Sequence, residues 1–283
     1  MLGKVFSYFK KLWLLHLEHV FISLSDLFLP RFCLVCGRVL CSTEKHLCIY
    51  CFSDLPLTRY SLLRSNPMAE RFNALLQEKS DVFHPYVYAA SLFFYNSSSG
   101  YKLIPQALKY HYALSSGRFF AKILGRGLAA SPMFADVDIV IPVPLHPLRK
   151  WKRGYNQAEI IAKEVAAALN AVLLTKILKR KKRTSTQTRL SVSDKYKNVY
   201  GAFSVDLKKF EVMLSVRKNG RYGENTLRSP ISKSHILLVD DVFTTGATLL
   251  SSYFALYSAI ENLPEHPYSF RISIATLCFV NET

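Results

Sequence analysis

The chain has 283 residues, half of them apolar and a fifth charged, with a formal net charge of +17 at pH 7. This composition excludes a disordered polyelectrolyte and allows one large α/β domain with a small appendage, or two modest domains. The charge is uneven, because residues 145–235 hold 21 lysines and arginines against 6 aspartates and glutamates. Such a concentration indicates a face that meets phosphate, pyrophosphate or nucleic acid, although a solvated basic surface without a ligand has the same composition.

The first thirty residues are apolar but interrupted by charge. Lys11, Glu18 and Asp26 keep every uncharged run shorter than the roughly 18 residues that a spanning helix needs. The small-residue cleavage site of a signal peptide is also missing. We therefore expect an amphipathic helix over residues 1–30 that docks on the rest of the protein, with peripheral membrane contact as a minor alternative. Without an export signal we expect a cytoplasmic chain with reduced thiols.

Five of the six cysteines fall between residues 33 and 51, and four of them form two CxxC pairs. Each CxxC turn directs two sulfurs at one metal ion, so the pairs predict a tetrahedral, structural Zn²⁺ site in a ribbon over residues 31–57. The expected ligands are Cys33, Cys36, Cys48 and Cys51. Cys41 and His46 lie in the intervening loop, and either could replace one ligand. A disulfide pair or simple buried thiols is the alternative, which the reducing compartment disfavours.

Downstream of the ribbon, residues 58–80 are polar and weakly patterned, and we expect them to be a connector. We expect one domain over residues 81–283, in which one strand and two helices come first and strand and helix patterns alternate from Asp138 onward. Strands are predicted at 86–95, 138–144, 171–178, 200–205, 235–241 and 270–280, and helices at 101–114, 117–131, 156–170 and 246–263. Apolar strands alternating with helices favour a parallel sheet with helices on both faces, and such sheets bind ligands beyond the carboxyl ends of their strands.

A run of acids and hydroxyls follows the strand "HILLV". Asp240 and Asp241 come first, and residues 244–248, "TTGAT", lead into the next helix. The first turn of a helix presents unpaired N–H groups, and Gly246 allows an anion to approach closely, so this turn can hold a phosphate. Two carboxylates upstream would repel a polyphosphate, and they suit sugar hydroxyls or a bridging Mg²⁺ better. A monophosphate and a ribose diol fit one ligand, a ribose 5-phosphate group. Simple helix capping by Asp241 or Thr244 explains only part of the run.

A second loop, "PLHPLRKWKRGYNQAE", follows the strand at 138–144. It carries four cations just before a helix, namely Arg149, Lys150, Lys152 and Arg153. This charge density suits a pyrophosphate better than a single phosphate, and the alternative is an exposed basic loop without a ligand.

These motifs resemble a known family. "ILLVDDVFTTGATL" looks like the phosphoribosyl pyrophosphate (PRPP) motif of type I phosphoribosyltransferases. "PVPLHPLRKWKRGYNQAEIIAKEVA" and "TQTRLSVSDKYKNVYGAF", with the double CxxC upstream, are similar to the ComF family of competence-associated, phosphoribosyltransferase-like proteins. The resemblance implies an α/β fold, with a type I phosphoribosyltransferase-like parallel sheet and flanking helices, preceded by a small zinc ribbon.

The resemblance also implies roles for single residues. Asp240 and Asp241 would contact the ribose hydroxyls of PRPP, and Arg153 and Gly154 would belong to the pyrophosphate loop. Asp240, Asp241 and Arg153 would take part in any catalysis. The residues expected at the 5-phosphate are Thr244, Thr245, Gly246, Ala247 and Thr248. A mobile loop over the ligand would contain Thr184, Gln187, Lys195 and Asn198. The family usually has arginine in place of Lys195, so a bidentate anion contact is lost there.

The resemblance implies a role in DNA uptake and natural competence, with PRPP or ribose 5-phosphate as the ligand. An active phosphoribosyltransferase would use PRPP as its Mg²⁺ complex and an unidentified nucleobase-like acceptor. A non-catalytic protein would bind single-stranded DNA or a partner such as a helicase through its basic face, or sense PRPP without turning it over. Residues 206–233 form a basic insertion, longer than the usual link in the family, for which we predict no role.

Overall fold

The computed structural model describes residues 29–110, 114–180, 202–210, 233–262 and 269–281. The chain forms two compact units. The small unit contains residues up to Pro56 together with Ser97–Ile104, and the large unit contains Leu57–Asn96 and the residues from Pro105 onward. The amphipathic helix expected over 1–30 falls almost wholly outside the described residues. Among the described helices, none combines the length and apolar character needed to cross a membrane.

The small unit is organised by two turns that carry cysteines. The first turn is closed by the N–H of Gly37, which donates to the carbonyl of Cys33 at 2.9 Å. Gly37 has φ +71°, a left-handed conformation that glycine adopts without strain. The second turn runs into helix α2 (Ile49–Ser53), and Cys48 is its N-cap. A short 3₁₀ turn, η2 (Gly100–Lys102), belongs to the same unit.

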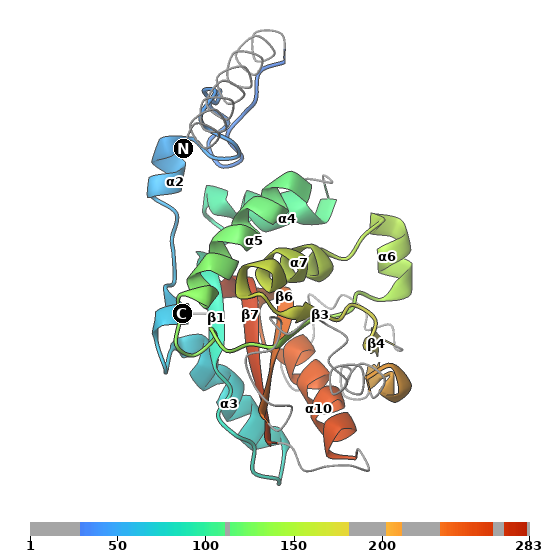
Figure 1. Cartoon of the computed structure of the whole chain (residues 1–283). Coiled ribbons are helices and arrows are strands. Elements are labelled where there is room, and N and C mark those ends of the chain that lie inside the picture. The colour runs from blue at the N-terminus through green and yellow to red at the C-terminus, as the bar shows by residue number, and fades with distance from the viewer. Residues whose placement is uncertain (1–28, 111–113, 181–201, 211–232, 263–268, 282–283) are drawn as a thin grey trace, which may run out of the picture. The chain divides into compact units, whose positions relative to one another are not determined.

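A five-stranded parallel sheet forms the centre of the large unit, in the order β1-β7-β6-β2-β3 (Figure 1). Its strands are β1 (Ala89–Tyr95), β2 (Ile139–Pro142), β3 (Val172–Leu173), β6 (Lys233–Phe243) and β7 (Ser269–Val280). Ile236, Leu237 and Leu238 are all buried, so side chains on both faces of β6 are covered. Burial on both faces explains why this strand reads as a continuous apolar run.

Helices cover both faces of the sheet, as the alternating pattern predicted (Figure 1). One face packs against α5 (Leu114–Ala129) and α7 (Gln157–Leu169), and the other packs against α3 (Pro67–Lys79) and α10 (Ala247–Glu261). The other helices in the described part of the large unit are α4 (Leu103–Tyr110), whose first two residues belong to the small unit, α6 (Pro147–Arg153) and the 3₁₀ turn η1 (Tyr60–Leu62). The predicted α/β fold class is confirmed by this parallel sheet.

Three local predictions differ from the structure. Residues 58–80, expected to be a connector, contain helix α3, whose Met68, Phe72 and Leu76 are buried in the core. Asn66 caps this helix by accepting from the N–H of Ala69 at 3.0 Å. The strand predicted at 171–178 is interrupted. Its ends form β3 and part of β4 (Leu178–Arg180), and β4 pairs antiparallel with β5 (Phe203–Val205) in a separate two-stranded sheet.

The "PLRKWKR" segment, expected to be a loop, is helix α6. His146 is its N-cap, Pro147 occupies its first turn, and Gly154 ends it in the left-handed region with φ +79°. Proline at the start and glycine after the end are ordinary helix boundary signals. Its cations are therefore presented from a helix.

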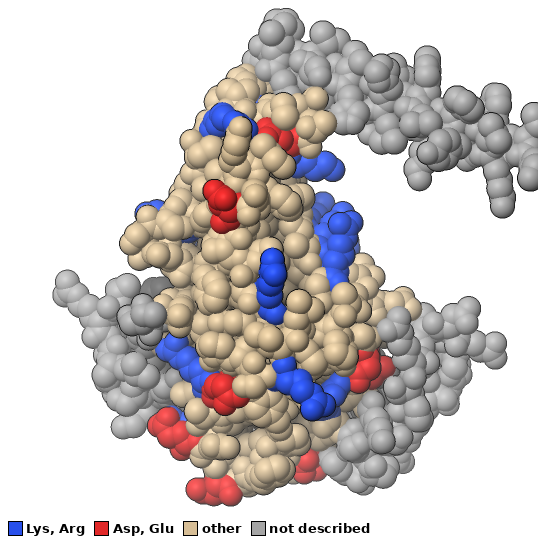
Figure 2. Space-filling view, turned by 90° about the vertical axis from the view of Figure 1, so that its left-hand side faces the viewer, with Lys and Arg blue, Asp and Glu red and all other residues tan. Residues whose placement is uncertain are grey.

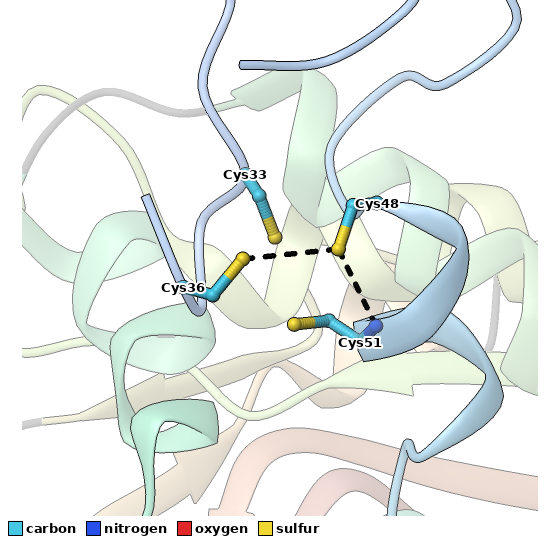
Figure 3. A group of neighbouring side chains, drawn as sticks. All are labelled: Cys33, Cys36, Cys48 and Cys51. Atoms are coloured by element: carbon cyan, nitrogen blue, oxygen red, sulfur yellow. Dashed lines mark hydrogen bonds between the residues drawn. The ribbon is translucent and has the colours of Figure 1, made fainter. Parts of the chain in front are cut away.

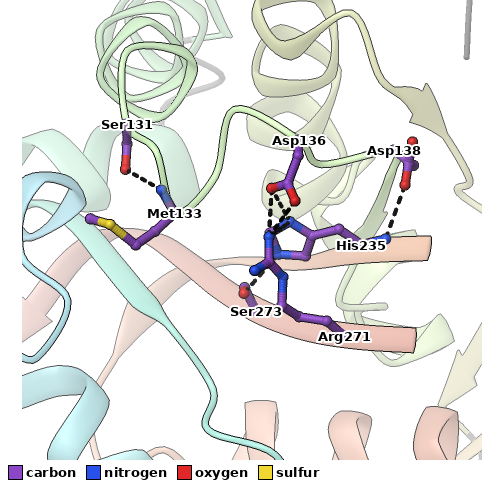
Figure 4. A network of polar contacts seen from close by, with 7 residues as sticks. All are labelled: Ser131, Met133, Asp136, Asp138, His235, Arg271 and Ser273. Atoms are coloured by element: carbon purple, nitrogen blue, oxygen red, sulfur yellow. Dashed lines mark hydrogen bonds and ion pairs between the residues drawn. The ribbon is translucent and has the colours of Figure 1, made fainter. Parts of the chain in front are cut away.

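A polar network joins the first residues of β6 and β7 to the segment before β2 (Figure 4). The ring of His235 lies between Asp136, with Nδ1 and Oδ1 2.9 Å apart, and Ser273, with Nε2 and Oγ 2.8 Å apart. Arg271 donates to Asp136 as well, at 2.5 and 2.6 Å. Burial lowers the pKa of His235. The network holds the amino ends of two central strands in register.

Candidate functional site

In the small unit the four predicted zinc ligands point their sulfurs at one another (Figure 3). The four sulfur atoms lie within 4.8 Å of one another, and the Sγ atoms of Cys36 and Cys48 are 3.7 Å apart. The spacing suits a tetrahedral site with Zn–S distances of about 2.3 Å. Cys41 lies outside this group, with its Sγ 3.5 Å from the hydroxyl of Thr43. The residues present therefore fit a closed, structural Zn²⁺ site.

Two of the four thiols have pKa values shifted in opposite directions. Burial alone would raise the pKa of Cys33, but hydrogen bonds from backbone N–H groups of Cys36 and Cys48 help to lower it to about 6. Burial raises the pKa of Cys51, and its neighbouring sulfurs raise it further. Neighbouring thiolates repel one another, and a divalent metal ion bound between them stabilises all of them in the deprotonated form.

The large unit has a cavity of about 440 Å³ at the carboxyl edge of its sheet. Its floor comes from the ends of β2 and β6, which contribute Val143 and Asp240 among others. These strands are neighbours, yet the chain runs from β2 outward to β3 and then returns to β6 on the other side of β2. Such a switch point is where open parallel sheets bind ligands.

Asp240 and Asp241 both line this cavity, from the last residues of β6. The carboxylate of Asp240 accepts the N–H of Asp241 at 2.9 Å. Burial and the charge of Asp241 raise the pKa of Asp240 to about 7. Asp241 instead faces Lys109, with Oδ2 and Nζ 3.1 Å apart. Because an ammonium group already contacts this carboxylate, the pair does not fit a resident Mg²⁺ held by Asp241.

The turn after β6 places hydroxyls and amides beside the acids. Thr244 and Thr248 line the cavity, whereas Thr245 is buried. Gly246 is the N-cap of α10 with φ +80°, and a glycine cap offers no side chain to the first-turn N–H groups. A Cβ at this position would lie 2.8 Å from the ring of Phe243, so only glycine fits here. Ala247 begins the helix, whose N-terminus is suited to an anion.

Two of the four predicted cations reach the cavity. Arg149 and Arg153 line it, and the guanidinium of Arg153 lies 5.6 Å from the centre of the Tyr110 ring. Lys150 forms an ion pair with Glu159 at 3.1 Å instead, and Lys152 is exposed and does not line the cavity. Gly154, which ends α6, is likewise outside the lining. Arg149 and Arg153 are four residues apart and so lie on the same face of helix α6, which Lys150 and Lys152 do not share.

Several polar residues of the cavity were not predicted from the sequence, and three of them bear on its chemistry. Lys109 comes from α4 and Arg180 from β4, each far along the chain from the acids. Burial lowers the pKa of Arg180, and Asp240 acts against this shift. Gln157 lies at the start of α7 and is 2% exposed, and its Nε2 has no hydrogen-bond partner among the described residues. Burying an amide N–H without an acceptor costs free energy of folding, so the Gln157 amide is a donor that a bound ligand can satisfy.

The loop expected to cover the ligand cannot be placed on this site. Thr184, Gln187, Lys195 and Asn198 all lie outside the described residues, as does most of the insertion at 206–233. Much of the predicted basic segment is therefore not part of the described surface. On the face in Figure 2, the described Lys and Arg side chains lie in separate groups over a largely uncharged surface.

The network around His235 contains serine, histidine and aspartate, the residue types of a hydrolytic triad. However, Ser273 is 0% exposed, so no substrate reaches its hydroxyl. The cavity at the carboxyl edge, in contrast, joins ionised groups and hydroxyls to open space.

Comparison with known proteins gives relatives named for DNA uptake. The chain is 38% identical over 112 residues to competence protein F of Haemophilus influenzae, a match that covers 40% of this chain and 41% of that protein. It is 28% identical over 112 residues to the DNA utilization protein YhgH of Escherichia coli (strain K12), covering 40% of each. The matches thus span well under two thirds of these relatives. They confirm the resemblance to competence-associated proteins. No protein-family model matches the chain.

Solved structures with a similar arrangement are adenine phosphoribosyltransferases. One from Trypanosoma brucei, in complex with AMP, pyrophosphate and ribose-5-phosphate, aligns with a TM-score of 0.28 at 13% identity, covering 78% of this chain and 84% of that one. One from Leishmania donovani aligns with a TM-score of 0.25 at 15% identity, with the same coverage. At such scores these alignments carry no argument about this chain.

Proposed function

We propose that this chain is a ComF-like protein of DNA uptake that binds PRPP or ribose 5-phosphate in the cavity at the end of its sheet. One observation carries the proposal. A single cavity of about 440 Å³ is lined by three chemically different kinds of group. These are two acids, the turn that leads into a glycine-capped helix, and two arginines. The relatives' names support the setting in DNA uptake.

Each part of the ligand has a matching part of the cavity. The amino end of α10, with Thr244 and Thr248, suits the 5-phosphate, because helix N-termini and hydroxyls donate to phosphate oxygens. The carboxylates of Asp240 and Asp241 accept hydrogen bonds from the ribose hydroxyls. Arg149 and Arg153 then face the 1-pyrophosphate. In this arrangement Mg²⁺ arrives bound to the pyrophosphate, as part of the ligand.

The experiment is calorimetry with ribose 5-phosphate and PRPP. We expect wild type to bind both and Asp241→Asn to bind at least about tenfold more weakly, since a charged hydrogen bond is worth about 1.5–3 kcal/mol. Asp81→Asn is the matched control, because Asp81 is exposed and lies outside the cavity. If wild type binds neither compound, the proposed function is wrong.

Transfer of the ribose 5-phosphate group is the second candidate function, and the two arginines favour it. Cations at the pyrophosphate stabilise the charge that develops as this group leaves C1 of the ribose. The test is a screen of nucleobases with PRPP that detects pyrophosphate release, with Arg153→Met as the comparison. Pyrophosphate release that requires a nucleobase and is lost in Arg153→Met supports transfer. Pyrophosphate release that occurs equally well without any nucleobase contradicts it.

A further inference from the structure

The cavity contains a fixed cation that faces its acids. Lys109, on helix α4, reaches Asp241 with Nζ and Oδ2 3.1 Å apart. The Lys109 side chain is 28% exposed and that of Asp241 15%, so water screens the pair only in part. The charge of Asp241 raises the pKa of Lys109, and the ammonium group stays protonated.

The backbone that carries Lys109 is itself anchored. Leu108, the preceding residue, is 1% exposed, and its carbonyl accepts a hydrogen bond from the hydroxyl of Tyr155. Tyr155 lies between α6 and α7, on the arginine side of the cavity. The lysine is therefore tied to the wall that presents the other cations, and it is not a loose surface side chain.

Among the described residues that line the cavity, cations outnumber acids. Four cations line it, namely Lys109, Arg149, Arg153 and Arg180, against the two acids of β6. With both acids ionised the lining keeps an excess of two positive charges. A sugar phosphate carries a charge of about −1.5 to −2 at neutral pH, which matches this excess. A divalent cation added to the same lining would enlarge the imbalance.

We propose that Lys109 takes the place of a divalent metal ion in this pocket, so that ribose 5-phosphate binds without Mg²⁺. Lys109 neutralises Asp241 and fixes its second oxygen towards the ribose hydroxyls, acting as a positioning residue. This inference rests on the proposed function and adds to it a dianionic sugar phosphate as a ligand that needs no metal. PRPP, with its additional pyrophosphate charge, still benefits from Mg²⁺.

The test measures the affinity for ribose 5-phosphate by calorimetry in buffers with and without Mg²⁺. Mg²⁺ is removed by dialysis and not by a chelator, because a chelator would also extract Zn²⁺ from the cysteine site. For wild type we expect the two affinities to agree within about twofold, which is a difference of only about 0.4 kcal/mol. Lys109→Met should bind at least about tenfold more weakly without Mg²⁺ and recover part of this loss when Mg²⁺ is added.

Two further variants control for structure and charge. Lys109→Arg keeps the positive charge and should retain binding without Mg²⁺. Lys122→Met removes a lysine of α5 whose side chain is 60% exposed and whose distance to Glu164 is 3.9 Å, and it should behave as wild type.

The outcomes separate the two proposals. Wild-type binding only in the presence of Mg²⁺ overturns this inference and leaves the proposed function standing. Full binding by Lys109→Met without Mg²⁺ also overturns it. Failure of wild type to bind in either buffer overturns the proposed function, and this inference with it. The wild-type comparison requires no variant to fold.

Discussion

Asp240 keeps its proton to a higher pH than an ordinary aspartate, because burial and the adjacent Asp241 both oppose its charge. Its pKa rises from 3.8 to about 7 on folding. Between these pH values the folded chain binds a proton that the unfolded chain has lost. The free energy of unfolding therefore falls as pH rises from about 4 to about 7. In the proposed function this cost is offset because the carboxylate serves the ligand.

We therefore predict that Asp240→Asn stabilises the protein, and more so in alkaline than in acidic buffer. The asparagine oxygen can still accept the N–H of Asp241. The gain in the free energy of unfolding should be larger at about pH 8.5 than at about pH 5.5, by about 2 kcal/mol. Urea unfolding of both proteins at the two pH values measures this difference. An equal gain at both values, or the same pattern in the exposed control Asp81→Asn, would contradict the argument.

At the scale of elements, the small unit shows why a short segment needs a metal. Its described helices and turns are only a few residues long, and Phe32, Ile49 and Tyr50 remain exposed. So little buried apolar surface cannot offset the loss of chain entropy. The four convergent cysteines could hold a metal ion such as Zn²⁺, and its binding would supply the missing free energy.

Cys48→Ser should remove the bound zinc and unfold the small unit. Cys48 is both a member of the sulfur cluster and the N-cap of α2, so its loss acts on the metal and the helix together. Cys41→Ser is the matched control, since Cys41 is exposed and outside the cluster. Elemental analysis after dialysis should find about one zinc per chain in wild type and Cys41→Ser. Full zinc content in Cys48→Ser would refute the assigned ligand set.

The elements also show where sequence patterns mislead. The polar residues of 58–80 predict a connector, although Met68, Phe72 and Leu76 follow a helical spacing behind the Asn66 cap of α3. The apolar run 171–178 predicts one strand, but it divides between two sheets. A short apolar run does not say which neighbour it will pair with, because pairing is decided by distant segments.

At the scale of the whole molecule, the sequence carries a formal net charge of +17 at pH 7. The basic segment 145–235 contributes Arg149, Arg153 and Arg180 to the cavity, and many of its other cations lie outside the described residues. Charge in excess of what one small ligand neutralises suits a polyanion such as single-stranded DNA.

We predict that the protein binds single-stranded DNA with steep salt dependence. Anisotropy of a labelled oligonucleotide should show affinity falling as salt rises, with a logarithmic slope of about −0.7 for each phosphate contact. Replacing Lys181, Lys182 and Arg183 by glutamine should reduce the slope by up to about 2. Ribose 5-phosphate should not compete with the oligonucleotide, because it binds only in the cavity. A flat salt response would exclude a surface that follows the phosphate backbone.

The sequence by itself determined the local chemistry. Two CxxC pairs are enough to bring four sulfurs together, because each turn is closed by nearby backbone. The acids and hydroxyls of the cavity were also predicted from one short segment, because Asp240, Asp241, Thr244 and Thr248 lie close together in the sequence between a strand and a helix. Only the tertiary structure decided which distant cations complete the site. Lys109 and Arg180 carry no local motif, and they meet Asp240 and Asp241 because the fold brings helix α4 and strand β4 to the cavity at the end of β6. Side-chain pairing across the cavity is a property of topology, which no short segment encodes.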